Sequence, residues 1–436
     1  MRCRGEETFH DLGPAPVSHT VRHLAIEATR LLRERRGISR YVRNVLRELT
    51  QQQPHLRFTL FVQRTRDIAA MRDLLDGLHT GLGDWAAVEP ISALAHTEAD
   101  VIWHPWNQVL HANTRAANVV TIHDIAPMLQ HDHRWWKIIK RAKYRRRYAR
   151  SIARADGILT ISQFTRDEVL ERFPASAEKL SVTLLAADDL ALSAPDDASA
   201  LQRSDCDDGF FLSVGGQEAR KNLSTLYAAM DRLWARGVRV PLVQCGPGLS
   251  KETRAIQGRA PWLRHIGYVT DAQLVTLYRR TTALVFPSRY EGFGLPVLEA
   301  MRSGAPVVCS TASSLPEVSG AAALSVAWND VEALTRAMHR IVNDAALRDD
   351  LRARGLVQAS GFSWARTASE TFDAMQRAVE RHRARSSPRT WRSTVQPMTR
   401  PIVHALAQMT QTPRLSPLAH RTVVRTATRL HEAPDR

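Results

Sequence analysis

The stretch PSRYEGFGLPVLEAMRSG, residues 287–304, decides how this chain is interpreted. The apolar run ALVF at 283–286 precedes it and predicts a buried strand. Gly292 and Gly294 free the backbone for a tight loop, Pro296 suits the first turn of a helix, and the final glycine suits its end. The helix N-terminus then presents unpaired N–H groups beside a strand end, which favours an anion and above all a phosphate.

Two carboxylates bracket this loop. Glu291 precedes the glycines, and we expect Glu299 in the first turn of the helix. A carboxylate repels a phosphate, so carboxylates beside a phosphate site indicate a ligand that also carries hydroxyl groups. Sugar hydroxyls on both sides of a diphosphate satisfy the pattern, and we therefore hypothesise a nucleotide-sugar site.

Length and composition bound the class of protein. The chain has 436 residues, enough for two domains, with 44% hydrophobic and 24% charged residues, as in soluble globular proteins. Its four cysteines are scattered, which indicates a reducing compartment. The charged start does not resemble a signal peptide, and no run approaches the roughly 18 apolar residues of a membrane span. We therefore expect a cytoplasmic protein.

The net charge of +16 predicts an anionic partner, which leaves nucleic acid, an anionic membrane surface and phosphorylated substrates open. The segment 134–154, RWWKIIKRAKYRRRYARSIAR, predicts a basic helix with interleaved aromatic residues. Its cationic side is either a solvated face or a surface for anionic lipid. No nucleic-acid-reading motif lies beside it, so we expect no nucleic-acid partner.

Strands and helices alternate along the chain, which predicts an α/β protein with two Rossmann-like domains whose parallel sheets face each other across a cleft. An acidic, Pro/Ser/Ala-rich segment separates the halves. The predicted parts are a disordered N-terminus (1–20), an N-terminal domain that takes the acceptor (21–190), a linker (191–208), a C-terminal domain that takes the donor (209–361), a crossover helix (362–382) and a basic tail (383–436).

Polar residues follow several predicted strands. Arg220 and Lys221 follow the strand at 210–214, with Asn222 as the expected N-cap of the next helix. His123 ends another strand, where open α/β sheets bind ligands. Taken singly, a structural ion pair or a structural histidine explains each of them equally well. Together at one sheet edge, the two cations and the helix termini favour a diphosphate that leaves as its glycosidic bond breaks.

These motifs resemble the family-4 retaining glycosyltransferases with a GT-B fold, and most closely mannosyltransferase-like members that build bacterial surface polysaccharides. The resemblance spans roughly residues 21–382 and is carried by RGISRY (36–41), HD (123–124), RKN (220–222), FPS (286–288), EGFGLPVLE (291–299) and LPE (315–317). One position departs from the pattern, because family members often have a second glycine where this chain has Ser39.

The resemblance implies a role for nine residues. The implied catalytic residues are His123, Arg220, Lys221 and Glu291; the implied donor-binding residues are Gly37, Phe293, Gly294, Leu295 and Glu299. In this scheme the two cations hold the diphosphate, Glu291 and His123 lie beside the donor sugar, and Glu299 binds the ribose hydroxyls. Gly37 approaches the diphosphate from the N-terminal domain, and the amides of 293–295 reach the sugar and diphosphate.

The implied reaction moves a hexose, with mannose favoured, and retains the anomeric configuration. It needs no cofactor and no metal ion, since the cations take the metal's place. GDP-mannose is the favoured donor and a UDP-sugar stays open; the acceptor is a glycan or a polyprenyl-diphosphate-linked saccharide. The basic helix and tail favour the inner face of the cytoplasmic membrane. The alternatives are a nucleotide-sugar epimerase of the same architecture, a glycoside hydrolase with two carboxylates and a nucleic-acid-binding protein.

Overall fold

The computed structural model describes residues 21–33, 37–78, 82–109, 115–129, 135–190, 197–206, 209–248 and 251–386. The chain forms two units, Met1–His382 and Arg383–Arg436. The predicted disordered N-terminus lies outside the described residues, as does the basic tail beyond Ser386.

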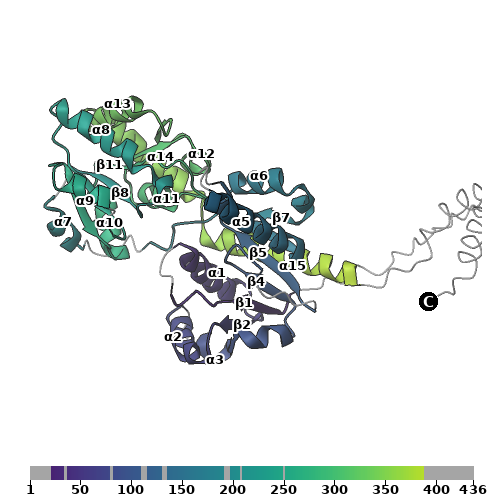
Figure 1. Cartoon of the computed structure of the whole chain (residues 1–436). Coiled ribbons are helices and arrows are strands. Elements are labelled where there is room, and N and C mark those ends of the chain that lie inside the picture. Colours follow the sequence, from purple (N-terminus) through teal and green to yellow (C-terminus); the bar gives the residue numbers. More distant parts are fainter. Residues whose placement is uncertain are drawn as a thin grey trace, which may run out of the picture. The chain divides into compact units, whose positions relative to one another are not determined.

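The N-terminal domain is built on a seven-stranded parallel sheet with the order β3-β2-β1-β4-β5-β6-β7 (Figure 1). Its central strands are buried along their whole length, as parallel strands covered by helices must be. The strands are β1 (His23–Glu27), β2 (Arg57–Val62), β3 (Ala87–Pro90), β4 (Val101–His104), β5 (Ala117–Ile122), β6 (Gly157–Thr160) and β7 (Leu180–Val182). The helices are α1 (Ile38–Gln52), α2 (Ile68–Leu78), α3 (Leu82–Trp85), α4 (Ala126–Leu129), α5 (Trp135–Arg154) and α6 (Gln163–Arg172).

The C-terminal domain repeats the plan with a six-stranded parallel sheet, in the order β10-β9-β8-β11-β12-β13. Its strands are β8 (Phe211–Val214), β9 (Leu242–Cys245), β10 (Leu263–Gly267), β11 (Ala283–Phe286), β12 (Val307–Ser310) and β13 (Leu324–Val326). Its helices are α7 (Ser199–Ser204), α8 (Leu223–Ala235), α9 (Lys251–Gln257), α10 (Asp271–Arg280), α11 (Leu295–Arg302), α12 (Leu315–Ser319), α13 (Val331–Asn343) and α14 (Ala345–Ser360). The predicted α/β class and the two parallel sheets are therefore confirmed.

Two elements differ from the sequence prediction. Strand β3 was not predicted, because it is a short edge strand that contains Glu89 and ends at Pro90, and it shows neither alternation nor an apolar run. The predicted linker contains helix α7, whose residues Ala200, Leu201 and Ser204 are buried. The rest of that segment, 191–196 and 207–208, lies outside the described residues, and the domain boundaries stay predictions.

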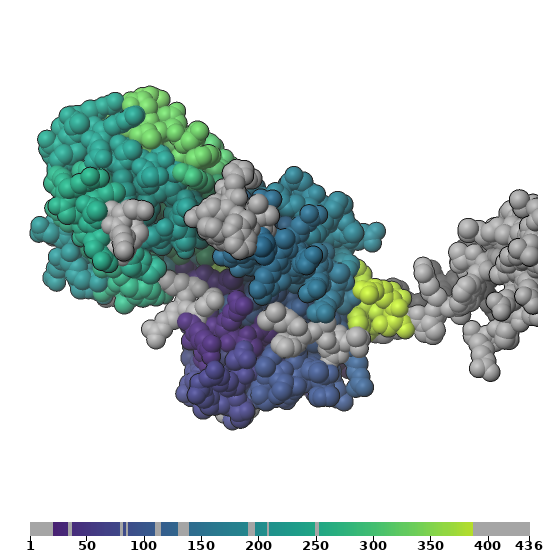
Figure 2. All heavy atoms as spheres, in the orientation of Figure 1, coloured from purple at the N-terminus to yellow at the C-terminus, as the bar shows by residue number. Residues whose placement is uncertain are grey.

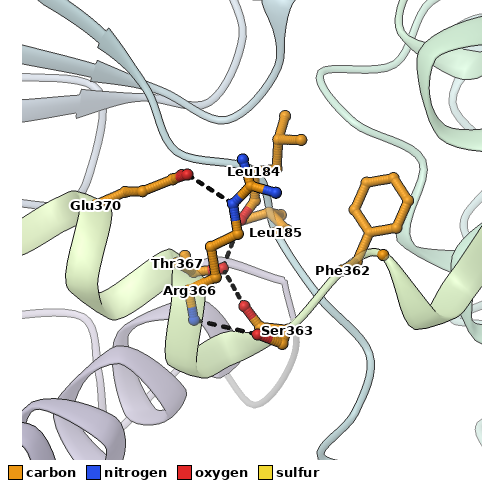
Figure 3. A pocket seen from close by; sticks show the side chains of 8 residues that line it. Leu184, Leu185, Phe362, Ser363, Arg366, Thr367 and Glu370 are labelled. Carbon is orange, nitrogen blue, oxygen red and sulfur yellow. Dashed lines mark hydrogen bonds and ion pairs between the residues drawn. The ribbon is translucent and has the colours of Figure 1, made fainter.

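The last helix, α15 (Trp364–Ser386), follows the C-terminal sheet in sequence but binds the N-terminal domain. Near its start, the Thr367 hydroxyl donates to the Leu184 carbonyl at 2.6 Å (Figure 3). Near its end, Arg381 donates to the Asp156 carbonyl at 2.8 Å. One hydrophobic cluster includes residues of both sheets, so the two domains share a core as well as this helix.

The strand order fixes where a ligand can bind. In each sheet the order reverses between two central strands, β1 and β4 in one and β8 and β11 in the other. Open α/β sheets bind ligands beyond the carboxyl ends of the strands at such a switch point. The loops after β1, β8 and β11 carry Gly37, Arg220 with Lys221, and Glu291, so the fold places the predicted residues at these edges.

Candidate active site

A cleft of about 970 Å³ lies between the two domains. Residues from both sides line it, among them Gly37, Arg40, Asn44 and Asp189 from the N-terminal half and Gly215, Tyr268, Leu295 and Glu299 from the C-terminal half. In Figure 2 the purple residues around α1 and the teal residues of the C-terminal domain appear on one face. The volume falls in the range of small-molecule sites, and three predicted donor-binding residues line the cleft.

Glu291 stands at the centre of a cluster of opposite charges. One carboxylate oxygen lies 2.7 Å from Nη1 of Arg220, and the other lies 2.9 Å from Nζ of Lys221. The Glu291 side chain is only 8% exposed, and burial alone would raise its pKa. The ammonium of Lys221 and the guanidinium of Arg220 outweigh burial and hold the pKa of Glu291 below its ordinary value. The structure thus brings three of the four predicted catalytic residues together.

The loop after β8 owes its shape to Asn222, which adopts the left-handed conformation with φ of 57°. Asn222 is the N-cap residue of α8, as predicted, but its side chain accepts no hydrogen bond from a backbone N–H of that helix. Its amide instead donates to the carbonyls of Pro287, at 3.0 Å, and Trp328, at 2.5 Å. Because Arg289 also donates its backbone N–H to the Arg220 carbonyl at 2.7 Å, the loops after β8 and β11 are tied together. This tie holds the two cations beside Glu291.

The glycines of the loop after β11 are required by close contacts. A Cβ at Gly292 would lie 2.1 Å from the carbonyl oxygen of His123 in the other domain. That carbonyl also accepts from Thr165 at 3.4 Å, and Ser162 donates to the Gly292 carbonyl at 2.7 Å. Gly294 has φ of 113°, a conformation that disfavours any other residue. Gly292 therefore allows the loop to rest directly on the N-terminal domain.

Glu299 lies in the second turn of α11, one turn later than predicted, because the helix begins at Leu295. One carboxylate oxygen accepts from Arg40 of α1, and the other accepts from the Tyr278 hydroxyl at 2.9 Å. Burial raises the pKa of Tyr278, and the Glu299 carboxylate beside it raises that pKa further. Glu299 thus lines the cleft as expected, but it also joins the two domains.

His123 is 6% exposed, and its Nε2 donates to the carbonyl of Pro105 at 2.8 Å. A carbonyl only accepts, so Nε2 carries the proton and Nδ1 keeps its lone pair. Burial lowers the pKa of His123 to about 4, and the imidazole is therefore neutral at pH 7. Its ring packs edge-on against Tyr41 at 5.4 Å between centroids. His123 contacts the loop after β11 through its backbone carbonyl, which lies against Gly292.

The amides predicted to reach the donor lie at the start of α11. Those of Phe293, Gly294 and Leu295 donate to no residue in the described parts of the chain, as expected for a helix N-terminus. The Phe293 side chain is 3% exposed and packs edge-on against Phe362, so only its backbone can bind a ligand. Gly37 precedes α1, lines the cleft and has φ of 63°.

Ser39, which departs from the family pattern, is fully buried, and its hydroxyl donates to the Leu31 carbonyl at 3.0 Å. The hydroxyl therefore has a partner within the loop before α1. Three other residues of the site were not predicted from the sequence, namely Arg40, Asp189 and Tyr278. Arg40 could have been found from the predicted helix, since it lies one turn after Gly37 on the same side. Nothing local marks Asp189 or Tyr278, whose positions depend on the packing of both domains.

No group of three or more His, Cys, Asp or Glu residues among the described residues is placed to hold a metal ion. Among the helices that the structure describes, none has the length and apolarity needed to cross a membrane.

The sequence matches two family models, one described as Glycosyltransferase Family 4, over residues 35–185, and one as Glycosyl transferases group 1, over residues 198–357. An O-antigen chain mannosyltransferase B from Escherichia coli is 36% identical over 290 residues, which cover 63% of this chain and 74% of that protein. The chain belongs to the family-4 glycosyltransferases. The serotype-specific mannosyltransferase WbdA of Escherichia coli is 32% identical over 60% of this chain, and the match spans 34% of that longer protein.

Solved structures agree on the fold. A sucrose-phosphate synthase from Thermosynechococcus elongatus superposes with a TM-score of 0.61 at 18% identity, over 84% of this chain and 99% of its own. Anabaena HepE in complex with UDP and glucose superposes with a TM-score of 0.58 at 14% identity, over 81% of this chain and 98% of the HepE chain. The predicted family and GT-B fold are confirmed. The comparisons favour the glycosyltransferase over the epimerase and nucleic-acid-binding alternatives.

Proposed function

We propose that this glycosyltransferase transfers mannose, with retention of the anomeric configuration, from a nucleoside-diphosphate donor to a saccharide acceptor in the synthesis of a surface polysaccharide. GDP-mannose is the favoured donor, and a UDP-sugar is the second candidate. The observation that carries the proposal is the buried Glu291 with Arg220 at 2.7 Å and Lys221 at 2.9 Å, at the carboxyl ends of β8 and β11. Several similar proteins are named mannosyltransferases, which supports mannose as the transferred sugar.

The proposed step balances within the substrates. The bond between the anomeric carbon and the diphosphate oxygen breaks, and its electron pair stays on the diphosphate. The acceptor oxygen bonds to the same face of the sugar, and its proton passes to the leaving phosphate. Arg220 and Lys221 stabilise the negative charge that develops on the diphosphate. Glu291, which holds both cations, keeps them in place and faces the donor sugar.

Glu299 would accept hydrogen bonds from the ribose hydroxyls, and the amides of 293–295 would bind the diphosphate and sugar. His123 would contribute a neutral imidazole near the sugar, since its pKa of about 4 leaves it uncharged at pH 7. These proposed roles use no metal ion and no cofactor.

The test is a transfer assay with GDP-mannose and UDP-glucose and with mannose-terminated oligosaccharides as acceptors. We expect transfer from GDP-mannose to give an α-linked product by NMR, because the donor is the α-anomer. We expect Glu291→Ala to lose at least about 99% of the activity. A β-linked product would contradict retention, and unchanged turnover by the variant would contradict the site.

The acceptor side of the proposal involves an anionic membrane surface. Eight basic residues of α5 are exposed, and within the described residues none of them pairs with a carboxylate: Lys140, Arg141, Lys143, Arg145, Arg146, Arg147, Arg150 and Arg154. Ile139 on the same helix is 59% exposed, whereas Tyr148 and Ile152 anchor the helix in the core. A lipid-linked acceptor held at such a surface would meet the N-terminal domain directly.

Vesicle co-sedimentation tests this surface. We expect binding to vesicles with anionic phosphatidylglycerol and little binding to neutral phosphatidylcholine, since each basic residue near an anionic surface contributes about 1 kcal/mol. Arg146→Glu with Arg147→Glu should weaken the binding. The control is Arg254→Glu with Arg259→Glu, which makes the same change of charge on the C-terminal domain. Equal binding to both vesicle types would contradict the proposal.

A further inference from the structure

The carboxylate that would bind the ribose is already engaged in this structure. Both oxygens of Glu299 accept hydrogen bonds, one from Arg40 and one from the Tyr278 hydroxyl at 2.9 Å. The Glu299 side chain is only 7% exposed. A ribose presents two neighbouring hydroxyls, and each Glu299 oxygen could accept one more hydrogen bond. A side chain that is 7% exposed leaves no space for both hydroxyls beside the two present partners, so one of these partners must move away.

The two partners are held differently. Tyr278 lies on α10 of the same domain as Glu299, is fully buried, and cannot leave without disturbing the core. Arg40 lies on α1 of the other domain, and its side chain is 17% exposed. The partner that can move away is therefore Arg40.

Arg40 also binds a second carboxylate, that of Asp189, and this contact would remain after Arg40 separates from Glu299. Its Nε and Nη2 donate to the two oxygens of Asp189, at 2.6 and 2.5 Å. Asp189 in turn accepts from Asn44 at 2.8 Å and from the indole of Trp364 at 2.9 Å. The charge of Arg40 is thus compensated on its own side of the cleft, which limits the cost of separation. Asp189 and Glu299 together raise the pKa of Arg40 above its ordinary value, against the effect of burial.

We propose that the Arg40–Glu299 ion pair is an interdomain latch that the donor's ribose displaces. The ion pair occupies Glu299, the residue proposed to bind the ribose, and connects α1 to α11. A nucleotide that bonds Glu299 through its ribose hydroxyls therefore releases the two domains from each other at this point. Arg40 stays with Asp189 when the latch opens. This inference rests on the proposed function, since it assigns the ribose to Glu299.

The latch predicts that loss of Arg40 improves nucleotide binding. Arg40→Gln removes the competitor and keeps a hydrogen-bond donor for Asp189. We expect the dissociation constant of the nucleoside diphosphate that the wild type binds, among GDP, UDP and ADP, to fall at least about fivefold. The same nucleotide as its 2′,3′-dideoxy form has no hydroxyls for Glu299 and should show no such gain. The matched control is Arg43→Ala, which removes a cation of the same helix and cleft and should not tighten binding.

Calorimetric titration of the full chain measures these affinities, and circular dichroism checks that each variant is folded. Equal affinity of the wild type and Arg40→Gln overturns the latch, as does an equal gain for the dideoxy nucleotide. Should Arg40→Gln fail to fold, Arg40→Lys, in which one ammonium replaces the three donor nitrogens that bind Asp189 and Glu299, must show a gain that depends on the ribose hydroxyls. A wild type that binds none of the three diphosphates overturns the proposed function as well, so the two failures are distinguishable.

Discussion

Replacing Lys221 with methionine removes one charge from the centre of the site and little else. The Lys221 side chain is 11% exposed, its Nζ lies 2.9 Å from Glu291, and it lies 4.7 Å from the centre of the Phe286 ring. Methionine keeps the apolar stem against that ring and loses the ammonium. The variant therefore separates the electrostatic role of Lys221 from its packing.

The structure sets the expected magnitude. Loss of one fixed donor to a developing negative charge costs about 2.7–4 kcal/mol in the transition state. Arg220 stays on the other oxygen of Glu291, so the lower end applies, and we expect kcat to fall about 100-fold. Glu291 keeps one cationic partner in the variant, so the free energy of unfolding should fall by only about 1–2 kcal/mol.

The assay compares initial rates of sugar transfer and urea unfolding curves for the two proteins. Lys179→Met is the matched control, because that lysine lies in the N-terminal domain, just before β7, and donates to the Ala155 carbonyl at 2.8 Å. The control should keep the wild-type rate. A Lys221→Met rate within threefold of the wild type would refute the role of the charge, and an unfolded variant would refute the claim that the site is separable from the core.

Two further predictions follow from the contacts of the loop after β11 and of His123. Gly292→Ala should destabilise the protein by about 1–3 kcal/mol and reduce the transfer rate more than tenfold, because its Cβ would lie 2.1 Å from the His123 carbonyl oxygen. Thermal unfolding and transfer rates test this prediction. The control is Gly77→Ala, where a Cβ meets nothing within 4 Å and the melting temperature should stay unchanged or rise. Folding lowers the pKa of His123 from 6.5 to about 4, so as the pH falls this histidine is protonated first in the unfolded chain. Above pH 6.5 the histidine is neutral in both states and costs no stability. As the pH falls from 6.5 to 4, the free energy of unfolding should decrease by about 3 kcal/mol. His123→Asn should lack that part of the pH dependence of unfolding, and identical slopes would contradict the buried neutral imidazole.

Much of the fold could be predicted from the sequence because the sheets are parallel and buried. Short apolar runs such as ALVF at 283–286 mark such strands directly, whereas β3, an edge strand with Glu89 and Pro90, carries no such signal. The loop with Glu291, Gly292 and Gly294 was recognisable from its two glycines. Gly294 serves a local backbone need, with φ of 113°, whereas the need for Gly292 comes from the distant His123 carbonyl.

The rest of the site depends on contacts between distant segments. Asn222 occupies the predicted cap position, but its side chain binds carbonyls 65 and 106 residues away, which no local pattern reveals. Arg40 meets Glu299 across 259 residues and Asp189 across 149. The sequence supports the hypothesis that Glu299 binds ribose hydroxyls, but no local pattern indicates that an arginine of the other domain already contacts that carboxylate.

The most direct test of the central claim compares a nucleoside diphosphate with the corresponding monophosphate by calorimetry, in the wild type and in Lys221→Met. In the proposed site, Arg220, Lys221 and the start of α11 bind the terminal phosphate. We expect the wild type to bind the diphosphate at least tenfold more tightly, about 1.4 kcal/mol, and the variant to lose most of that difference. Equal affinity of the wild type for both nucleotides, or an undiminished difference in the variant, would contradict the proposed site.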